Sequence, residues 1–242
     1  MDPLPSSTPS PPIATASKKF VGVDGCRAGW IAISITDNVD DVLSMTLHRN
    51  ARDLAAFAHE TSIVAIDMPI GLSETGRRAC DAEARRMLGR RGVTVFNAPP
   101  RNSLGAEEFS AASALSRAAG GHGISIQTYN LLPRIRDLDD ALTSFSCPVA
   151  EVHPEVSFTL MTGAPLPSKK TLDGRQQRRD AIASRWPEID QLLRSRPSRC
   201  AVDDVLDAAA VLWSALRIAR GCAMTFGDGA IDARGIAMVI RA

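Results

Sequence analysis

The sequence feature that most restricts the fold of this chain is a short, uninterrupted apolar run at residues 63–66. Most of its residues are β-branched, and the run ends in Asp67, Met68 and Pro69. A strand with one solvent-exposed face alternates polar and apolar residues, whereas a continuous apolar run is typical of a parallel strand buried on both faces. Burial on both faces requires helices on both sides of the sheet, so the run predicts an α/β protein.

The segments around this run predict a mixed sheet. Residues 19–26, 30–36 and 42–48 are closely spaced strand candidates joined by turns that contain Gly and Asp, which indicates an antiparallel meander. A fifth strand is expected at residues 148–152. Together with the run at 63–66, these segments predict a five-stranded mixed sheet with helices on both faces. The expected helices are 51–59, 76–88, 106–119, 155–162, 173–194 with a break near Pro187, and 202–220, with an irregular segment at 90–103 and an edge strand at 236–240.

Composition limits the remaining possibilities. Residues 1–17 are rich in Pro, Ser and Thr and have no apolar segment typical of a signal peptide, so we expect a disordered tail followed by a single domain at 18–242. The net charge of +1 gives no overall attraction to nucleic acid or anionic membranes, and no apolar run is long enough to span a bilayer. The five cysteines are scattered without a C-x-x-C pair, which favours reduced thiols and a cytoplasmic location.

Acidic residues fall where the predicted strands end. Asp24 closes the first strand, Asp67 the fourth and Glu151 the fifth. Asp204 and Asp207 lie at the start of the last helix, three residues apart and therefore on one face. Ligands of open α/β sheets bind at the carboxyl ends of strands, so these carboxylates are expected to converge. Crowded carboxylates favour a hard divalent cation, and the sequence therefore predicts a Mg²⁺ or Mn²⁺ site.

Each of these acids also has a structural explanation. Asp at a helix start commonly caps the helix, which accounts for Asp203 and is an equal alternative for Asp204. Asp24 followed by Gly25, and Asp67 followed by Met-Pro, could both serve turns. The functional interpretation therefore depends on the whole set of acids rather than on any single one.

Several longer motifs resemble a known protein family. They occur in order along almost the whole chain after the tail, and they look like the bacterial family catalogued as domain of unknown function 429. The motifs are V-G-V-D-G-C-R-A-G-W at 21–30, I-D-M-P-I-G-L at 66–72, R-R-A-C-D-A-E-A-R-R at 77–86, V-F-N-A-P-P-R at 95–101, E-V-H-P-E-V-S-F at 151–158, S-K-K-T at 168–171 and D-D-V-L-D-A at 203–208.

The resemblance implies a ribonuclease H-like fold with an insertion between the fourth and fifth strands, and a predicted nuclease activity. The final helix is also similar to that of Holliday-junction resolvases, because Asp204 and Asp207 with the following Ala match their D-x-x-D-A pattern. By this analogy Asp24 is the metal ligand of the first strand, and Asp204 and Asp207 are the ligands of the helix. Asp67 and Glu151 compete for the remaining carboxylate position, and the superfamily pattern favours Asp67.

Other motif residues are candidates for proton transfer or phosphate binding. His153 could act as a general base or hold a water, and the alternative is a structural histidine that bonds the backbone. Lys169 and Lys170 lie in a loop between prolines and the next helix, where they could bind a phosphate, or be ordinary solvated lysines.

A local concentration of arginines suggests a contact surface for nucleic acid. On the expected helix at 76–88, Arg78, Arg85 and Arg86 would form a stripe suited to a phosphate backbone. A solvated helix face paired with nearby acids, Glu74 among them, is the structural alternative.

The leading functional hypothesis is a metal-dependent nuclease or phosphodiesterase. A binding or regulatory module without turnover is the second, because the charge is near neutral and few aromatic residues could stack on bases. An actin-like phosphotransferase is disfavoured, since residues 25–29 lack a phosphate clasp rich in Ser and Thr. Chemistry on a small metabolite at the same acidic site is a fourth possibility.

Overall fold

The computed structural model describes residues 17–38, 42–120 and 122–242. Apart from Ser17, the tail expected at 1–17 lies outside these residues. The described part contains no helix with both the length and the apolar character needed to cross a membrane.

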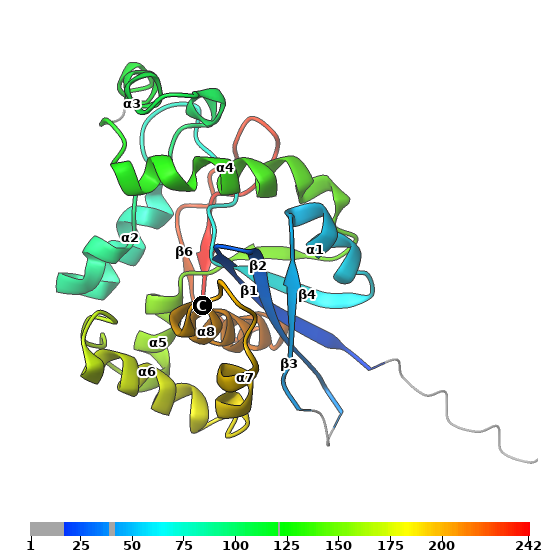
Figure 1. Ribbon diagram of the computed structural model, residues 1–242. Helices are drawn as coiled ribbons and strands as arrows, with labels where there is room; N and C mark the ends of the chain where they lie inside the picture. Colours follow the sequence, from blue (N-terminus) through cyan, green and yellow to red (C-terminus); the bar gives the residue numbers. More distant parts are fainter. Residues whose placement is uncertain (1–16, 39–41, 121) are drawn as a thin grey trace, which may run out of the picture.

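A mixed five-stranded sheet forms the centre of the protein, with strand order β3-β2-β1-β4-β5 (Figure 1). β1 pairs antiparallel with β2, and β2 with β3, as the meander predicted. β4 pairs in parallel with both β1 and β5. The prediction of a mixed five-stranded sheet is confirmed. The strands are β1 (Lys19–Cys26), β2 (Gly29–Thr36), β3 (Ser44–His48), β4 (Thr61–Ile66) and β5 (Val149–Glu151).

The central strands are buried on both faces because their alternate residues enter two separate cores. On β4, Ile63 and Ala65 belong to one core and Val64 and Ile66 to the other, and each of the four is at most 5 % exposed. Since successive side chains of a strand point to opposite faces, a continuous apolar run is what this position requires. The interpretation of residues 63–66 is therefore confirmed.

One face of the sheet is covered by four helices from the C-terminal half of the chain. Their apolar residues pack with those of β1, β2 and β4 in a single core. Residues 173–194 form two helices rather than one, with the break at the expected Pro187. The helices are α5 (Pro154–Thr162), α6 (Leu172–Ala183), α7 (Ile189–Ser195) and α8 (Val202–Ala219).

The other face is covered by α1 (Ala51–Phe57) and α4 (Ile126–Ala141), as Figure 1 shows. The buried Trp30 of β2 donates its indole N–H to Asp137 of α4 at 2.8 Å, which fixes the helix against the sheet. The expectation of helices on both faces is thus confirmed, although α4 itself was not predicted.

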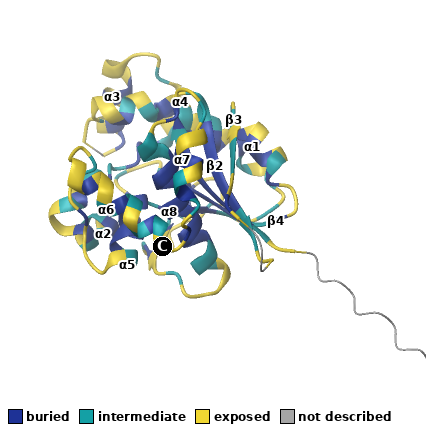
Figure 2. Ribbon diagram, turned by 60° about the horizontal axis from the view of Figure 1, so that its bottom comes forward, coloured by how far each residue is buried: buried dark blue, intermediate teal, exposed yellow. Residues whose placement is uncertain are grey.

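A long segment between β4 and β5 includes α4 and several shorter helices. Figure 2 shows that α3 lies away from the sheet with much of its surface exposed. α2 begins three residues later than residue 76, where the helix was expected. The segment contains α2 (Ala79–Leu88), η1 (Gly89–Thr94), η2 (Arg101–Gly105), α3 (Phe109–Ala118), α4 and η3 (Leu142–Ser144), where η marks a 3₁₀-helix.

The C-terminal segment differs from the predicted edge strand at 236–240. Within it, Ile236 and Met238 bond back to Asp232 and Ala230, so this part of the run folds on itself. What remains is β7 (Ile240–Arg241), which pairs with β6 (Thr225–Phe226) in a separate two-stranded sheet. The prediction of an added edge strand on the main sheet was wrong.

Candidate functional site

The close approach of α8 to β1 positions the first pair of acids. A Cβ placed on Gly22 of β1 would lie 2.1 Å from the backbone N of Leu212 and 2.4 Å from the carbonyl of Ala208. Only glycine at this position allows the helix backbone to contact the strand. Asp24 is two residues after Gly22 and therefore points to the same face, toward α8. Asp207 precedes Ala208 on that helix, so the contact brings both carboxylates to the end of β1.

Asp67 joins them from the neighbouring strand. Its backbone N–H donates to the carbonyl of Val23 at 2.9 Å, which continues the β1–β4 ladder beyond the end of β4. Asp67 follows the alternation of Ile63 and Ala65, both of which pack under α8. Its side chain therefore lies on the same face as Asp24.

The carboxylates are close enough to affect one another's ionisation. Burial raises the pKa of Asp24 well above its usual range, and repulsion from Asp67, Asp207 and Asp204 raises it further. Burial likewise raises the pKa of Asp67, again with repulsion from Asp207. These causes group Asp24 and Asp207, which are buried, with the partly exposed Asp67 in what we call below the acidic cluster.

Lys169 supplies a positive charge to the acidic cluster. It lies in the loop between α5 and α6, and its Nζ donates to Asp207 at 2.7 Å while its side chain remains 42 % exposed. Burial lowers the pKa of Lys169, but attraction to Asp207, Asp24 and Asp67 outweighs this and holds it above its usual value. The lysine is therefore protonated and partly balances the acids.

Asp204 has a structural role at the start of α8. Its carboxylate accepts a hydrogen bond of 2.7 Å from the backbone N–H of Ala201, which precedes the helix. This bond satisfies one of the unpaired donors at a helix start. The capping role expected of Asp203 is thus performed by Asp204, which also contributes to the repulsion on Asp24.

Glu151 converges only in part with the other acids, because it lines the same narrow crevice as Asp67 and its charge adds to the burial that raises the pKa of Asp67. Glu151 is in register with Ile66, which points to the face covered by α1 and α4. Its side chain therefore lies on the opposite face of the sheet from Asp67. Both carboxylate oxygens accept from Arg78 at 2.7 Å, and one also accepts from the Ile70 backbone N–H at 2.7 Å. Glu151 serves a buried ion pair rather than the acidic cluster.

The predicted arginine stripe is also wrong. Arg78 precedes the first turn of α2 and is 3 % exposed, because it also bonds the buried Asp81. It cannot contact a phosphate backbone in this position. Arg85 donates to the Val95 carbonyl at 2.9 Å and lines a cavity, whereas Arg86 is exposed on another part of the helix.

His153 and Lys170 occupy different environments. The Nδ1 of His153 accepts from the backbone N–H of Glu155 at 3.2 Å, so the ring caps α5, which agrees with the structural alternative. Burial lowers the pKa of His153 and favours the neutral ring that this bond requires. His153 borders a narrow crevice that also contains Asp67. Lys170 is exposed and, unlike its neighbour, makes no ion pair with a described residue.

Arg134 lies beside the acidic cluster and was missed by the sequence analysis. This residue of α4 donates to the Cys26 carbonyl at 2.6 Å, and its side chain lies 2.6 Å from the position of a Cβ on Gly25. It also stacks over the ring of Trp30, 5.6 Å from the centroid. No motif marked Arg134, because the helix that carries it was not predicted.

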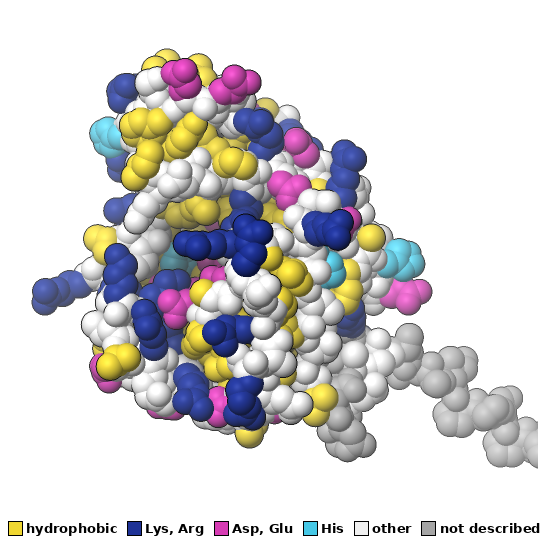
Figure 3. Space-filling model, in the orientation of Figure 1, with side chains coloured by type: hydrophobic (Ala, Val, Ile, Leu, Met, Phe, Trp, Pro, Cys, Tyr) yellow, Lys and Arg dark blue, Asp and Glu magenta, His cyan; other side chains and the backbone are white. Residues whose placement is uncertain are grey.

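The surface around these residues is hollowed and strongly charged. In Figure 3, Lys and Arg side chains surround a depression between α4 and the helices α5 and α6, with acidic side chains visible inside it. Such an arrangement, with acids surrounded by basic side chains, is suited to an anionic ligand that is bound together with a cation.

Replacing Asp24 by asparagine should stabilise the fold at neutral pH. Because the folded state raises the pKa of Asp24 above its ordinary 3.8, folding favours the protonated form. The folded state therefore loses stability as the pH rises from 3.8, the ordinary pKa, through the raised pKa of the folded state. In chelator, Asp24→Asn should melt higher than the wild type at neutral pH, where each kcal/mol corresponds to about 2–4 °C, and the difference should shrink toward pH 3.8.

Thermal melting across pH measures this effect. Asp140→Asn, on an exposed residue of α4, is the matched control and should leave the profile unchanged. A lower melting temperature for Asp24→Asn at neutral pH would show that the Asp24 carboxylate stabilises the fold and that the acids are not mutually repelled.

A comparison with protein families gives one match that covers most of the chain. The family model described as "Protein of unknown function (DUF429)" matches residues 22–230, which include all members of the acidic cluster and Lys169. No curated protein matches the chain.

Proposed function

This chain belongs to the DUF429 family, and from that premise we propose that it is a divalent-metal-dependent nuclease or phosphodiesterase. The observation that carries the proposal is the convergence of Asp24, Asp67 and Asp207 on one face of the sheet, beside Lys169. Three carboxylates, of which Asp24 and Asp207 are buried and Asp67 is partly exposed, leave an excess of negative charge beside one lysine. By contrast, the buried ion pair between Arg178 and Glu155 joins one charge of each sign.

We further infer that the fold is ribonuclease H-like. The support is the order of elements: a three-stranded antiparallel meander, a helix, a parallel strand, an inserted segment, a second parallel strand and a long closing helix. This is the order that the family resemblance implied, and it places one acid at the end of the first strand and another on the closing helix. Fold alone does not define an activity, so the proposal depends on the acids.

The chemistry of the acidic cluster fits Mg²⁺ or Mn²⁺. Both ions prefer oxygen ligands, and the carboxylates of Asp24, Asp67 and Asp207 would hold them, with Asp204 nearby. In the present arrangement of the described residues, no group of three His, Cys, Asp or Glu side chains is spaced to hold a metal. Lys169 bonds Asp207 directly, and its flexible, partly exposed side chain would have to move when an ion is bound.

The bound ion and the protein would contribute separately to phosphodiester cleavage. A divalent ion would lower the pKa of a water and stabilise charge on the leaving oxygen. Lys169, once released from Asp207, can bind a phosphate oxygen of the substrate. Arg134 supplies a second positive charge at the end of β1, held in place by its bond to Cys26. His153, whose Nδ1 caps α5, is assigned a structural role.

A cleavage assay with a metal series tests the proposal. Labelled single-stranded DNA, duplex DNA, RNA and bis(p-nitrophenyl) phosphate should be incubated with the full chain in Mg²⁺, Mn²⁺ or chelator. We expect hydrolysis of at least one diester that chelator abolishes. In parallel, ion at about a hundred times its dissociation constant should stabilise the fold by about 2.7 kcal/mol, or about 5–10 °C in melting temperature.

Other outcomes favour the remaining hypotheses. Binding of an oligonucleotide without hydrolysis in any metal would identify a binding module. Release of phosphate from mononucleotides, with every diester left intact, would identify an enzyme that acts on small metabolites. Either result would contradict the nuclease proposal.

A further inference from the structure

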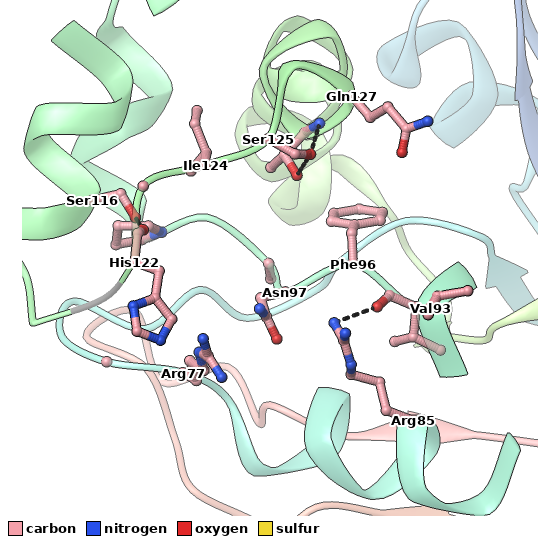
Figure 4. Close-up of a pocket in the computed structure, with 16 residues that line it drawn as sticks. Arg77, Arg85, Val93, Phe96, Asn97, Ser116, His122, Ile124, Ser125 and Gln127 are labelled. Atoms are coloured by element: carbon pink, nitrogen blue, oxygen red, sulfur yellow. Dashed lines mark hydrogen bonds between the residues drawn. The ribbon is translucent and has the colours of Figure 1, made fainter. Parts of the chain in front are cut away.

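A second cavity lies next to the acidic cluster, between the main body of the fold and the α3–α4 part of the inserted segment. Its volume is about 260 Å³. One wall comes from α2 and from the segment after η1, and the other from the end of α3 and the start of α4 (Figure 4). We call it the insertion cavity. The residues that carry the argument are Arg77, Arg85, Phe96, Asn97, His122 and Gln127.

The insertion cavity is suited to an anion. Arg77 and Arg85 contribute two positive charges, and none of the described residues that line it is acidic. One guanidinium nitrogen of Arg85 donates to the carbonyl of Val95, which fixes the arm in position while its other nitrogens remain available. The cavity also meets the first turn of α4, whose helix dipole adds positive potential. In Figure 4, the guanidinium groups and the His122 ring lie below this turn.

The same cavity presents an aromatic ring and two amides. Phe96 is half-buried, and its ring lies below the first turn of α4 in Figure 4. Asn97 and Gln127 contribute side-chain amides, which can both donate and accept hydrogen bonds. An aromatic face with amides at its edge is the usual means of holding an unstacked nucleobase. Positive charge beside such a platform matches a nucleotide rather than a simple anion.

Shared residues connect the insertion cavity to the acidic cluster. Val95 and Phe96 line both this cavity and the crevice that contains Asp67 and His153. The insertion cavity is therefore adjacent to the crevice at Asp67, which is itself narrow, with a volume of about 20 Å³. The volume of the insertion cavity is slightly below the range of about 300–1,000 Å³ usual for whole-ligand pockets, which suits one unit of a longer chain.

We propose that the insertion cavity binds one nucleotide of a single-stranded nucleic acid, next to the phosphodiester at the acidic cluster. The base stacks on Phe96, Asn97 and Gln127 contact its edge, and Arg77 and Arg85 bind its phosphate. This role rests on the proposed nuclease function, and it also assigns a role to the V-F-N motif at 95–97. The base has to leave a duplex stack to enter the cavity, so single strands are preferred over duplexes.

Binding measured in chelator tests the proposal without turnover. The probes are a fluorescein-labelled single-stranded oligonucleotide, uridine 5′-monophosphate and ribose 5-phosphate, and the readouts are anisotropy and calorimetry with the full chain. Arg77→Ala removes an exposed side chain, and Phe96→Leu keeps apolar contact but removes the stacking face. We expect each variant to weaken oligonucleotide binding about tenfold. Arg77→Ala should also reduce the salt slope by about 0.7, the value for one phosphate contact on a single strand.

The controls separate this cavity from the rest of the surface. Arg52→Ala, at an exposed arginine of α1, should leave the affinity and the salt slope unchanged. Ribose 5-phosphate should bind more weakly than uridine 5′-monophosphate, because it has no base to stack. Equal binding of the two compounds, or unchanged oligonucleotide affinity in both variants, would overturn the proposal. If uridine 5′-monophosphate binds but the oligonucleotide does not, the insertion cavity cannot hold one nucleotide of a longer single strand, and the proposal would be overturned.

Failure of this inference can be distinguished from failure of the proposed function. If the wild type cleaves a diester and both variants cleave and bind equally well, the insertion cavity has no role and the nuclease proposal stands. If the oligonucleotide binds through Arg77 and Phe96 but is not hydrolysed in any metal, the cavity stands and the nuclease proposal fails.

Discussion

Replacing Asp207 by asparagine is expected to lower metal-dependent hydrolysis of a phosphodiester by about 10³-fold or more. Asparagine keeps the shape of the side chain and can still accept a hydrogen bond from Lys169, but it removes the charge that would hold a divalent ion. Asp207 is 4 % exposed and belongs to the helix whose backbone contacts Gly22 of β1, so its side chain is held in a fixed position. Initial rates in Mn²⁺, with the most sensitive diester substrate, measure the effect.

Asp140→Asn is the matched control for this experiment. Asp140 is exposed on α4 and lies outside the acidic cluster, so its variant should retain activity close to that of the wild type. Asp207→Asn should also show a smaller rise in melting temperature when Mn²⁺ is added. Full activity in Asp207→Asn, with a normal response to metal, would remove Asp207 from the site and leave the proposed function without its central residue.

The main sheet could be predicted because burial leaves a strong pattern in short strands. The run at 63–66 has no polar interruption, and the structure buries all four residues. Strand-end acids followed from the same pattern. Asp24 and Asp67 were placed correctly at adjacent strand ends, since parallel strands that are neighbours end at the same edge of a sheet.

Glu151 shows where this reasoning stops. β5 has only three residues, and a shift of one residue exchanges the two faces of a strand. Nothing in so short a segment indicates whether Glu151 or Ala150 points toward α8. The partner that decides the matter, Arg78, is distant in sequence, and its burial depends on Glu151 in turn. Sequence patterns identify which face of a helix or strand is buried, but they do not identify ion pairs between residues that are distant in sequence.

The inserted segment was the least predictable part for a similar reason. The helix α4 contains Pro133, which interrupts the pattern normally used to recognise a helix. Its buried residues Leu132, Ile135 and Leu138 are spaced three positions apart. Their burial depends on packing against the sheet, which the sequence of the helix alone does not reveal. Because α4 was missed, Arg134 and the insertion cavity were missed with it.

The largest loss of stability is expected from Arg78→Met. Arg78 is 3 % exposed and bonds Glu151, Asp81 and the carbonyls of Ile70 and Gly71, so it joins the end of β5, the loop after β4 and the start of α2. Its removal leaves two buried carboxylates without a counter-charge. Breaking a buried ion pair on one side costs about 3–5 kcal/mol, which corresponds to a fall in melting temperature of about 6–20 °C for a chain of this size. Thermal and urea unfolding measure this difference.

Two further variants separate a buried charge network from simple loss of packing. Arg77→Ala, at the exposed neighbouring arginine, should change the free energy of unfolding by less than about 0.5 kcal/mol. The double variant Arg78→Met/Glu151→Leu should recover part of the loss, because one of the two unpaired carboxylates is removed with its partner. Asp81 also accepts from the Ala98 backbone N–H at 2.8 Å. In the double variant its buried carboxylate would still lack a counter-charge, so the recovery would be incomplete. If the double variant were less stable than Arg78→Met alone, Glu151 would stabilise the fold without Arg78, for example through its bond to the Ile70 N–H, and unpaired charge would not be the main cost of losing Arg78.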